Sequence, residues 1–202
     1  MSAAAEPIYL LRHGETLWNT MRRIQGHKDS PLTALGERQA AAMGALLADL
    51  IADRVAVEIV ASPLGRAART AAIVARGLGL DPGCIRFDDR LMEMSWGIYD
   101  GHTRPEMAAK APDFFQRRAA DHWGFVPPGG ESYAMTAARL RAWLAEQSRQ
   151  QPLVAVTHGA TARILRGLYA GLSPDEIFAA DEPQDAIFRL QHGNVHRIET
   201  GM

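Results

Sequence analysis

Two histidines, His13 and His158, each precede a glycine and each stand where an apolar run ends. Arg12 stands beside the first histidine, and Arg66 follows a third apolar run by a few residues. In open α/β sheets the ligand binds at the carboxyl ends of the strands, so we expect these two imidazoles and two guanidiniums to converge. One His-Gly pair alone indicates only a turn. Four such donors together need an anion between them, and a tetrahedral phosphoryl group suits them best.

Strand-like and helix-like apolar patterns alternate along the chain, and they supply the elements that must position these side chains. We expect Thr33 to begin a helix that runs to about Asp53, and Ser62 to cap a second helix in which Pro63 takes the first position. Ser62 could instead orient one of the two imidazoles, but we favour the cap. The expected strands are Ile8–Leu11, Val57–Ala61 and Leu153–Val156. A third helix is expected from Gly159 to about Tyr169, and Phe188–Leu190 and Val195–Ile198 are expected to form a terminal hairpin. This alternation predicts an α/β fold, a three-layer α/β/α sandwich with a mostly parallel central sheet.

The interval from Glu93 to about Gly130 interrupts this alternation with two short helical pieces, about Thr103–Lys110 and Pro112–Ala120. Irregular segments of this length within a compact domain usually serve a function, often as a cover. We therefore expect one domain over residues 1–202, with a small helical insertion at about 94–130 that covers the active site.

Four segments of the chain resemble, in the same order, the motifs of the histidine phosphatase (phosphoglycerate mutase-like) superfamily. They span residues 8 to about 170, so the resemblance covers most of the chain. The segments are Leu11-Arg12-His13-Gly14-Glu15-Thr16 with Trp18-Asn19, Ser62-Pro63-Leu64-Gly65-Arg66-Ala67, Leu91-x-Glu93-x-x-x-Gly97, and Val156-Thr157-His158-Gly159.

The resemblance implies a role for each of five residues. His13 would attack phosphorus through Nε2 and form a phosphohistidine, while its other ring nitrogen donates to a nearby backbone carbonyl. Arg12, Arg66 and a protonated His158 would hold the phosphate oxygens, and Glu93 would protonate the leaving oxygen and later take a proton from water. Further substrate contacts are expected from Asn19, Gln25, Gly26, Gly159, Arg104 and Trp96.

The superfamily contains phosphatases and phosphomutases, and the residues after Glu93 favour a phosphatase. Similar mutases have an arginine directly after the acid, whereas this chain has Met94, which cannot bind a second phosphate. A phosphomutase stays the alternative, because Arg104 and the pair Arg117-Arg118 could reach a substrate carboxylate. A non-catalytic phospholigand-binding protein is the third interpretation, although all five core residues are present. The sequence does not decide which small phosphorylated metabolite is the substrate.

The composition argues against several other classes of protein. The chain of 202 residues has a net charge of −1 and no polybasic segment, which excludes a general nucleic-acid or membrane-surface binder. A single cysteine, Cys84, allows no disulfide framework, and the N-terminal segment does not resemble a signal peptide. His192 and His196 flank a turn rather than a helix, so we expect no metal site there, no metal and no cofactor. We expect a cytoplasmic protein, either a monomer or a homodimer.

Overall fold

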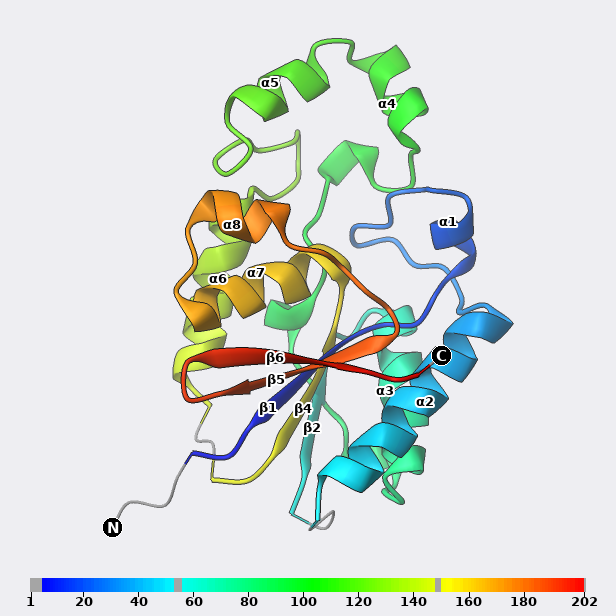
Figure 1. Cartoon of the computed structure of the whole chain (residues 1–202). Coiled ribbons are helices and arrows are strands. Elements are labelled where there is room, and N and C mark those ends of the chain that lie inside the picture. The colour runs from blue at the N-terminus through cyan, green and yellow to red at the C-terminus, as the bar shows by residue number, and fades with distance from the viewer. Residues whose placement is uncertain (1–4, 53–55, 148–149, 202) are drawn as a thin grey trace.

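The computed structural model describes residues 5–52, 56–147 and 150–201, and its centre is a six-stranded sheet in the order β3-β2-β4-β1-β5-β6 (Figure 1). Strands β3, β2, β4 and β1 are parallel, whereas β5 and β6 form an antiparallel hairpin at one edge. The strands are β1 (Ile8–Arg12), β2 (Glu58–Ala61), β3 (Arg86–Phe87), β4 (Leu153–Thr157), β5 (Ala186–Gln191) and β6 (Asn194–Glu199). The predicted mostly parallel sheet is confirmed.

Alternating side chains on each strand build two separate cores, one on each face of the sheet. On β1, Ile8 and Leu10 pack against α6 (Tyr133–Ala145) and α7 (Gly159–Ala170), whereas Tyr9 and Leu11 pack against α2 (Ala34–Leu50) and α3 (Gly65–Gly77). This period of two is the geometry of a strand buried on both faces. Figure 1 shows the two helical layers on opposite sides of the sheet, which confirms the three-layer sandwich.

The order of the central strands brings together the three strand ends that carry candidate site residues. Strands β2, β4 and β1 are neighbours and run parallel, so Ser62, His158 and His13 all follow the same edge of the sheet. The backbone N–H of His13 donates to the carbonyl of Thr157 at 2.9 Å, and that of Ser62 donates to Val156 at 3.0 Å. Backbone hydrogen bonds to β4 therefore fix the positions of His13 and Ser62 at the edge of the sheet.

Residues 94–130 extend beyond that edge and have a small apolar centre of their own. This segment holds η3 (Gly97–Tyr99), α4 (Arg104–Lys110) and α5 (Phe114–Ala120), at the top of Figure 1. Tyr99, Met107 and Phe114 are buried together there, with Phe115 and Phe125 packed against them. We refer to residues 94–130 as the cover.

The boundaries differ from those expected in a few places. Thr33 caps α2 as predicted, but α2 ends at Leu50, and the expected end near Asp53 lies outside the described residues. The helices α6 and α8 (Pro174–Ala179) were not predicted. The remaining short elements are α1 (Leu17–Thr20), η1 (Pro82–Cys84) and η2 (Asp89–Leu91). Within the described part of the chain, no helix has the length and apolar character needed to span a membrane.

Candidate active site

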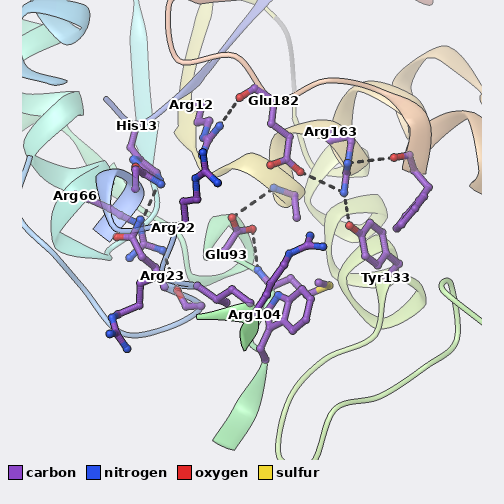
Figure 2. Close-up of a pocket in the computed structure, with 18 of the residues that line it drawn as sticks. Arg12, His13, Arg22, Arg23, Arg66, Glu93, Arg104, Tyr133, Arg163 and Glu182 are labelled. Carbon is purple, nitrogen blue, oxygen red and sulfur yellow. Dashed lines mark hydrogen bonds and ion pairs between the residues drawn. The ribbon is translucent and has the colours of Figure 1, made fainter. Parts of the chain in front are cut away.

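A pocket of about 490 Å³ opens at the carboxyl ends of the central strands, between the sheet and the cover (Figure 2). Its wall includes most of the residues that the sequence analysis singled out. These are Arg12, His13, Asn19, Gln25, Gly26, Arg66, Glu93, Trp96 and Arg104. Residues far apart in the sequence are thus brought to one cavity.

The hydrogen bonds of His13 define which of its nitrogens carries the proton. Nδ1 lies 2.8 Å from the carbonyl oxygen of Gly14, which only accepts, so Nδ1 is the donor. Nε2 receives the Nε–H of Arg66 at 3.3 Å and therefore presents a lone pair. Burial, and then the charges of Arg12 and Arg66, lower the pKa of His13 well below 6.5. His13 is consequently a neutral imidazole whose Nε2 is free to act as a nucleophile.

The chain must bend sharply after His13 for the side chains of Arg12 and His13 to reach one pocket, and Gly14 allows this. A Cβ on Gly14 would overlap the backbone of Gly36 at the start of α2. The backbone N–H of Gly14 donates to the hydroxyl of Thr70 at 3.1 Å. A glycine is required here because α2 approaches the backbone closely.

Two guanidiniums approach this nucleophile from different elements. Arg12, at the end of β1, donates to the backbone carbonyl of Glu182 in the loop before β5. Arg66 lies in the first turn of α3, is 1% exposed, and forms an ion pair with Asp29 at 3.1 Å. Glu182 was not predicted as a site residue, because its loop reaches the pocket only through the tertiary fold. Its carboxylate also pairs with Arg163 at 3.2 Å.

His158 is fully buried beside His13, and its partner corrects one expectation. Ser62 was expected to cap α3 in preference to orienting an imidazole, but Leu64 is the N-cap residue and its side chain makes no capping hydrogen bond. The Ser62 hydroxyl instead lies 2.7 Å from Nε2 of His158, and it accepts from the backbone of Leu64 at 3.3 Å. The physical reason is that β2 ends at Ala61 as expected but α3 begins only at Gly65, so Ser62 lies between the strand and the helix, beside the neighbouring strand end.

The protonation of His158 also differs from the expected imidazolium when no anion is bound. Burial is the largest cause that lowers the pKa of His158, and the positive charges of Arg66 and Arg12 lower it further, so this pKa lies well below 6.5. Its Nδ1 is buried and has no hydrogen-bond partner among the described residues.

Glu93 is held at the first turn of α7, opposite the histidines. Its Oε1 accepts the backbone N–H groups of Met94 at 3.0 Å and Thr161 at 3.2 Å, and Oε2 accepts that of Ala160 at 3.4 Å. The N-terminus of a helix favours a carboxylate in this position. In Figure 2, Glu93 lies between the group of His13 and Arg66 and the group of Arg163 and Tyr133.

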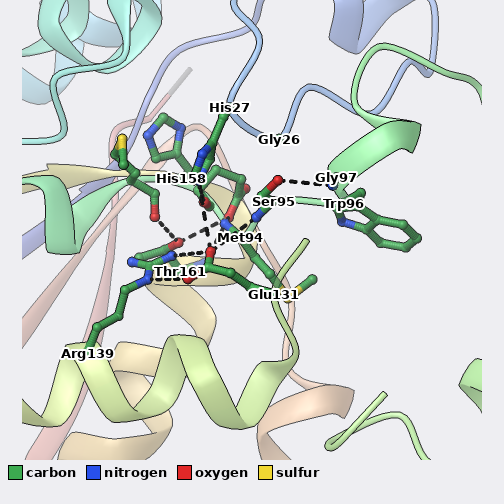
Figure 3. A network of polar contacts seen from close by, with 12 residues as sticks. Gly26, His27, Met94, Ser95, Trp96, Gly97, Glu131, Arg139, His158 and Thr161 are labelled. Atoms are coloured by element: carbon green, nitrogen blue, oxygen red, sulfur yellow. Dashed lines mark hydrogen bonds and ion pairs between the residues drawn. The ribbon is translucent and has the colours of Figure 1, made fainter. Parts of the chain in front are cut away.

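A second network fixes the backbone on either side of Glu93 (Figure 3). Nε2 of His27 lies 2.9 Å from the Glu93 carbonyl oxygen, so His27 also contacts the site. Glu131 accepts the N–H of Ser95 at 3.2 Å and is paired with Arg139 at 3.0 Å. The cover therefore begins from a rigid attachment.

The outer wall of the pocket is a stack of arginine and aromatic side chains. The guanidinium of Arg118, on α5, lies 5.0 Å from the centre of the Trp96 ring and 5.3 Å from that of Phe178. Arg163 faces the same Phe178 at 5.5 Å and donates to the Tyr133 hydroxyl. Burial lowers the pKa of Arg118 from its ordinary value, and the nearby Arg104 and Arg163 add to this. The sequence analysis named Arg118 as a residue that could reach a substrate carboxylate, whereas Tyr133, Arg163 and Phe178 were missed.

The other candidate residues lie at or beyond the edge of the pocket. Gly159 is not part of the wall, because it packs behind Arg12, where a Cβ would overlap the Glu182 carboxylate. Arg117 points away and pairs with Asp113 at 3.8 Å on the exposed side of α5. His192 stands in the turn of the β5–β6 hairpin, as predicted. Over the residues described, no three His, Cys, Asp or Glu side chains gather as they would around a metal ion.

Comparison with known proteins identifies the family to which these residues belong. The model of the histidine phosphatase superfamily (branch 1) matches residues 8–196. A probable phosphoglycerate mutase GpmB of Salmonella paratyphi C is 37% identical over 169 residues, which are 82% of this chain and 75% of the relative.

Solved structures of similar proteins cover nearly the whole chain. The mycobacterial glucosyl-3-phosphoglycerate phosphatase solved with VO3 is 29% identical, with a TM-score of 0.78 over 96% of this chain and 97% of that one. The alpha-ribazole phosphatase from Shigella flexneri, 22% identical, has a TM-score of 0.79 over 96% and 95%, and shows the fold alone. With its motifs in family order and the family model matched over residues 8–196, this chain belongs to the histidine phosphatase superfamily, branch 1.

Proposed function

We propose that the chain is a metal-independent phosphomonoester hydrolase that acts on a small phosphorylated metabolite through a phosphohistidine intermediate. The tautomer of His13 carries this proposal. Nδ1–H bonded to Gly14 and an Nε2 lone pair beside Arg66 form a neutral nucleophile next to a cation that can hold phosphate. Such an arrangement supports attack on phosphorus at neutral pH.

In the first step Nε2 of His13 bonds to phosphorus and the bond from phosphorus to the leaving oxygen breaks. Glu93, in its protonated form, gives its proton to that oxygen. Arg12, Arg66 and His158 stabilise the charge on the three remaining oxygens, which is the main contribution in phosphoryl transfer. Nδ1 of His158 would donate to one of these oxygens, which gives this buried atom its partner. In the second step Glu93 takes a proton from water, and the water oxygen displaces His13 to release phosphate.

The outer wall supports a leaving group with its own negative charge. Arg22, Arg104 and Arg118 line the pocket and have no carboxylate partner among the residues described, unlike Arg66 and Arg163. A substrate carboxylate or second phosphate would offset this charge. The same arginines keep a phosphomutase as the second candidate, and the relative named as a probable phosphoglycerate mutase agrees with it. Met94, 3% exposed in the pocket wall beside Glu93, favours the phosphatase, because it adds no cation there.

The test is hydrolysis of para-nitrophenyl phosphate in the presence of EDTA by the wild type, His13→Ala and His196→Ala. His196 is an exposed residue of β6, so His196→Ala controls for the loss of an imidazole. We expect turnover in EDTA by the wild type and the control, and none by His13→Ala. Rapid quenching in base, in which phosphohistidine survives, should trap phosphate on the wild type.

Two other results would contradict the hydrolase. Turnover that EDTA abolishes would refute the metal-independent reaction. Absence of hydrolysis together with interconversion of phosphoglycerates would favour the phosphomutase, in which the phosphohistidine is protected from water.

A further inference from the structure

Arg66 is held by a loop, residues 26–29, that accepts three of the five N–H groups of its side chain. Nη1 donates to the carbonyl of Lys28 at 2.7 Å and to Oδ1 of Asp29 at 3.1 Å. Nη2 donates to the carbonyl of Gly26 at 2.8 Å, and Nε donates to Nε2 of His13 at 3.3 Å. Four of the five N–H groups of the side chain are therefore engaged, and three of these bonds come from residues 26–29.

The pattern leaves one edge of the guanidinium facing the nucleophile. Nε–H and one Nη2–H point along the same edge, and together they match two oxygens of a phosphate. The loop accepts both protons of Nη1 and one proton of Nη2, which leaves the second Nη2 proton for a ligand. Because Nε of this edge contacts Nε2 of His13, the edge lies where phosphorus must bond during attack.

Asp29 is the carboxylate in this arrangement, and it bonds to Arg66 twice. Oδ1 accepts Nη1 and also the backbone N–H of Arg66 at 3.2 Å, so one oxygen joins the start of α3 to its own side chain. Gly65 makes room for it, since a Cβ there would overlap Oδ2 of Asp29. The Asp29 side chain is 42% exposed, so it does not contribute to a buried core.

We infer that Asp29 is a positioning residue, which rotates Arg66 so that its Nε–Nη2 edge meets the transferring phosphoryl group. This inference rests on the proposed phosphohistidine reaction and adds a residue to it. Asp29 touches neither His13 nor the phosphate, and acts only through Arg66. An arginine held by the two carbonyls alone would retain its charge but lose the alignment.

The experiment compares Asp29→Ala with Glu37→Ala, a matched control. Glu37 is also a half-exposed acid paired with an arginine of α3, but its partner is Arg69, on the outer side of that helix. We expect Asp29→Ala to lower kcat/KM for para-nitrophenyl phosphate about 10- to 100-fold, the effect of a small misplacement. Inhibition by orthovanadate should weaken by about tenfold or more, while Glu37→Ala matches the wild type.

A double-mutant cycle separates this role from a structural one. In the background Arg66→Ala, adding Asp29→Ala should cause no further loss of activity or of vanadate affinity, because its effect passes through Arg66. Equal losses in both backgrounds, or wild-type behaviour of Asp29→Ala, would overturn the inference. If Asp29→Ala does not fold, Asp29→Asn takes its place, with a loss of about threefold that must vanish in the Arg66→Ala background.

Failure of the proposed function gives a different result. A wild type that hydrolyses no phosphomonoester contradicts the hydrolase, but vanadate binding measured by calorimetry still tests Asp29. Weaker binding by Asp29→Ala than by Glu37→Ala would support the positioning role without turnover, and equal binding would refute it.

Discussion

Acidification from pH 7 to pH 5 should destabilise this protein through two buried imidazoles. His13 is 2% exposed and His158 is fully buried, and burial holds the pKa of each well below the 6.5 of an exposed histidine. The unfolded chain takes up protons on both rings as the pH falls through 6.5, whereas the folded protein takes them up only at a lower pH. The free energy of unfolding is therefore constant above this pH for these groups, and decreases below it.

The size of the decrease follows from the two rings. Each proton that only the unfolded state binds removes about 1.4 kcal/mol per pH unit, so the pair removes about 2.7 kcal/mol per pH unit. Integrated from pH 7 to pH 5 with an unfolded pKa of 6.5, the loss reaches at most about 1.9 kcal/mol for each ring and about 4 kcal/mol in total, when both folded rings stay neutral. This is a large part of the free energy of unfolding of a typical folded domain, which is roughly 5–15 kcal/mol. Asp88, whose pKa hydrogen bonds from Arg90 lower, adds little in this window, because an aspartate in the unfolded chain takes up its proton mainly below pH 5.

The assay is urea unfolding followed by tryptophan fluorescence at several pH values, on the wild type and on His→Gln variants. His13→Gln and His158→Gln should each lose about 2 kcal/mol less stability than the wild type between pH 7 and pH 5, and the double variant should lose little. His196→Gln, on exposed β6, is the control and should follow the wild type. A wild type whose stability is unchanged across this range, or a double variant that still loses about 4 kcal/mol, would refute the reasoning.

Three further substitutions have outcomes that the geometry specifies. Ser62→Ala should lower kcat about tenfold, because it removes the hydroxyl at 2.7 Å from His158, and it should have no effect when His158 is already alanine. Gly14→Ala should reduce the free energy of unfolding in urea by more than about 3 kcal/mol, since its Cβ would overlap the backbone of Gly36. Arg118→Leu should raise KM about tenfold for a phosphomonoester with a carboxylate on its leaving group, and leave that of para-nitrophenyl phosphate unchanged in steady-state assays.

The sequence predicts the strand ends of this fold well, because the features that define them are local. Short apolar runs mark β1, β2 and β4, and His13 and His158 follow two of them directly. That the two histidines lie close together can be predicted from one rule, that the carboxyl ends of parallel strands lie at the same edge of a sheet. Two helices were missed although their local signals are present. Ser132 caps α6, and Ser173 with Glu176 forms a capping box with proline at the first turn of α8.

The outer wall could not be predicted in this way, because its residues meet only in the folded chain. Arg118 comes from the cover, Arg163 from α7, and Glu182 from the loop before β5. No spacing relates them, and each alone is indistinguishable from an exposed charge. The same holds for Asp29, whose importance depends on the position of Arg66 in space. Ser62 was assigned to the wrong partner for a related reason: a serine before proline is a good helix cap, and only the sheet order reveals His158 beside it.

The burial that destabilises the protein in acid is also what makes His13 a usable nucleophile. A solvent-exposed imidazole would exchange tautomers and be half protonated near pH 6.5, whereas His13 is held neutral by burial and by the charges of Arg12 and Arg66. The same two arginines then attract a phosphate dianion, which offsets their charge and favours a proton on His158. In the proposed reaction the site would therefore change its charge state when substrate binds, with neutral rings before the attack and a protonated His158 that stabilises the transferred group afterwards. Both properties follow from placing two histidines at adjacent buried strand ends.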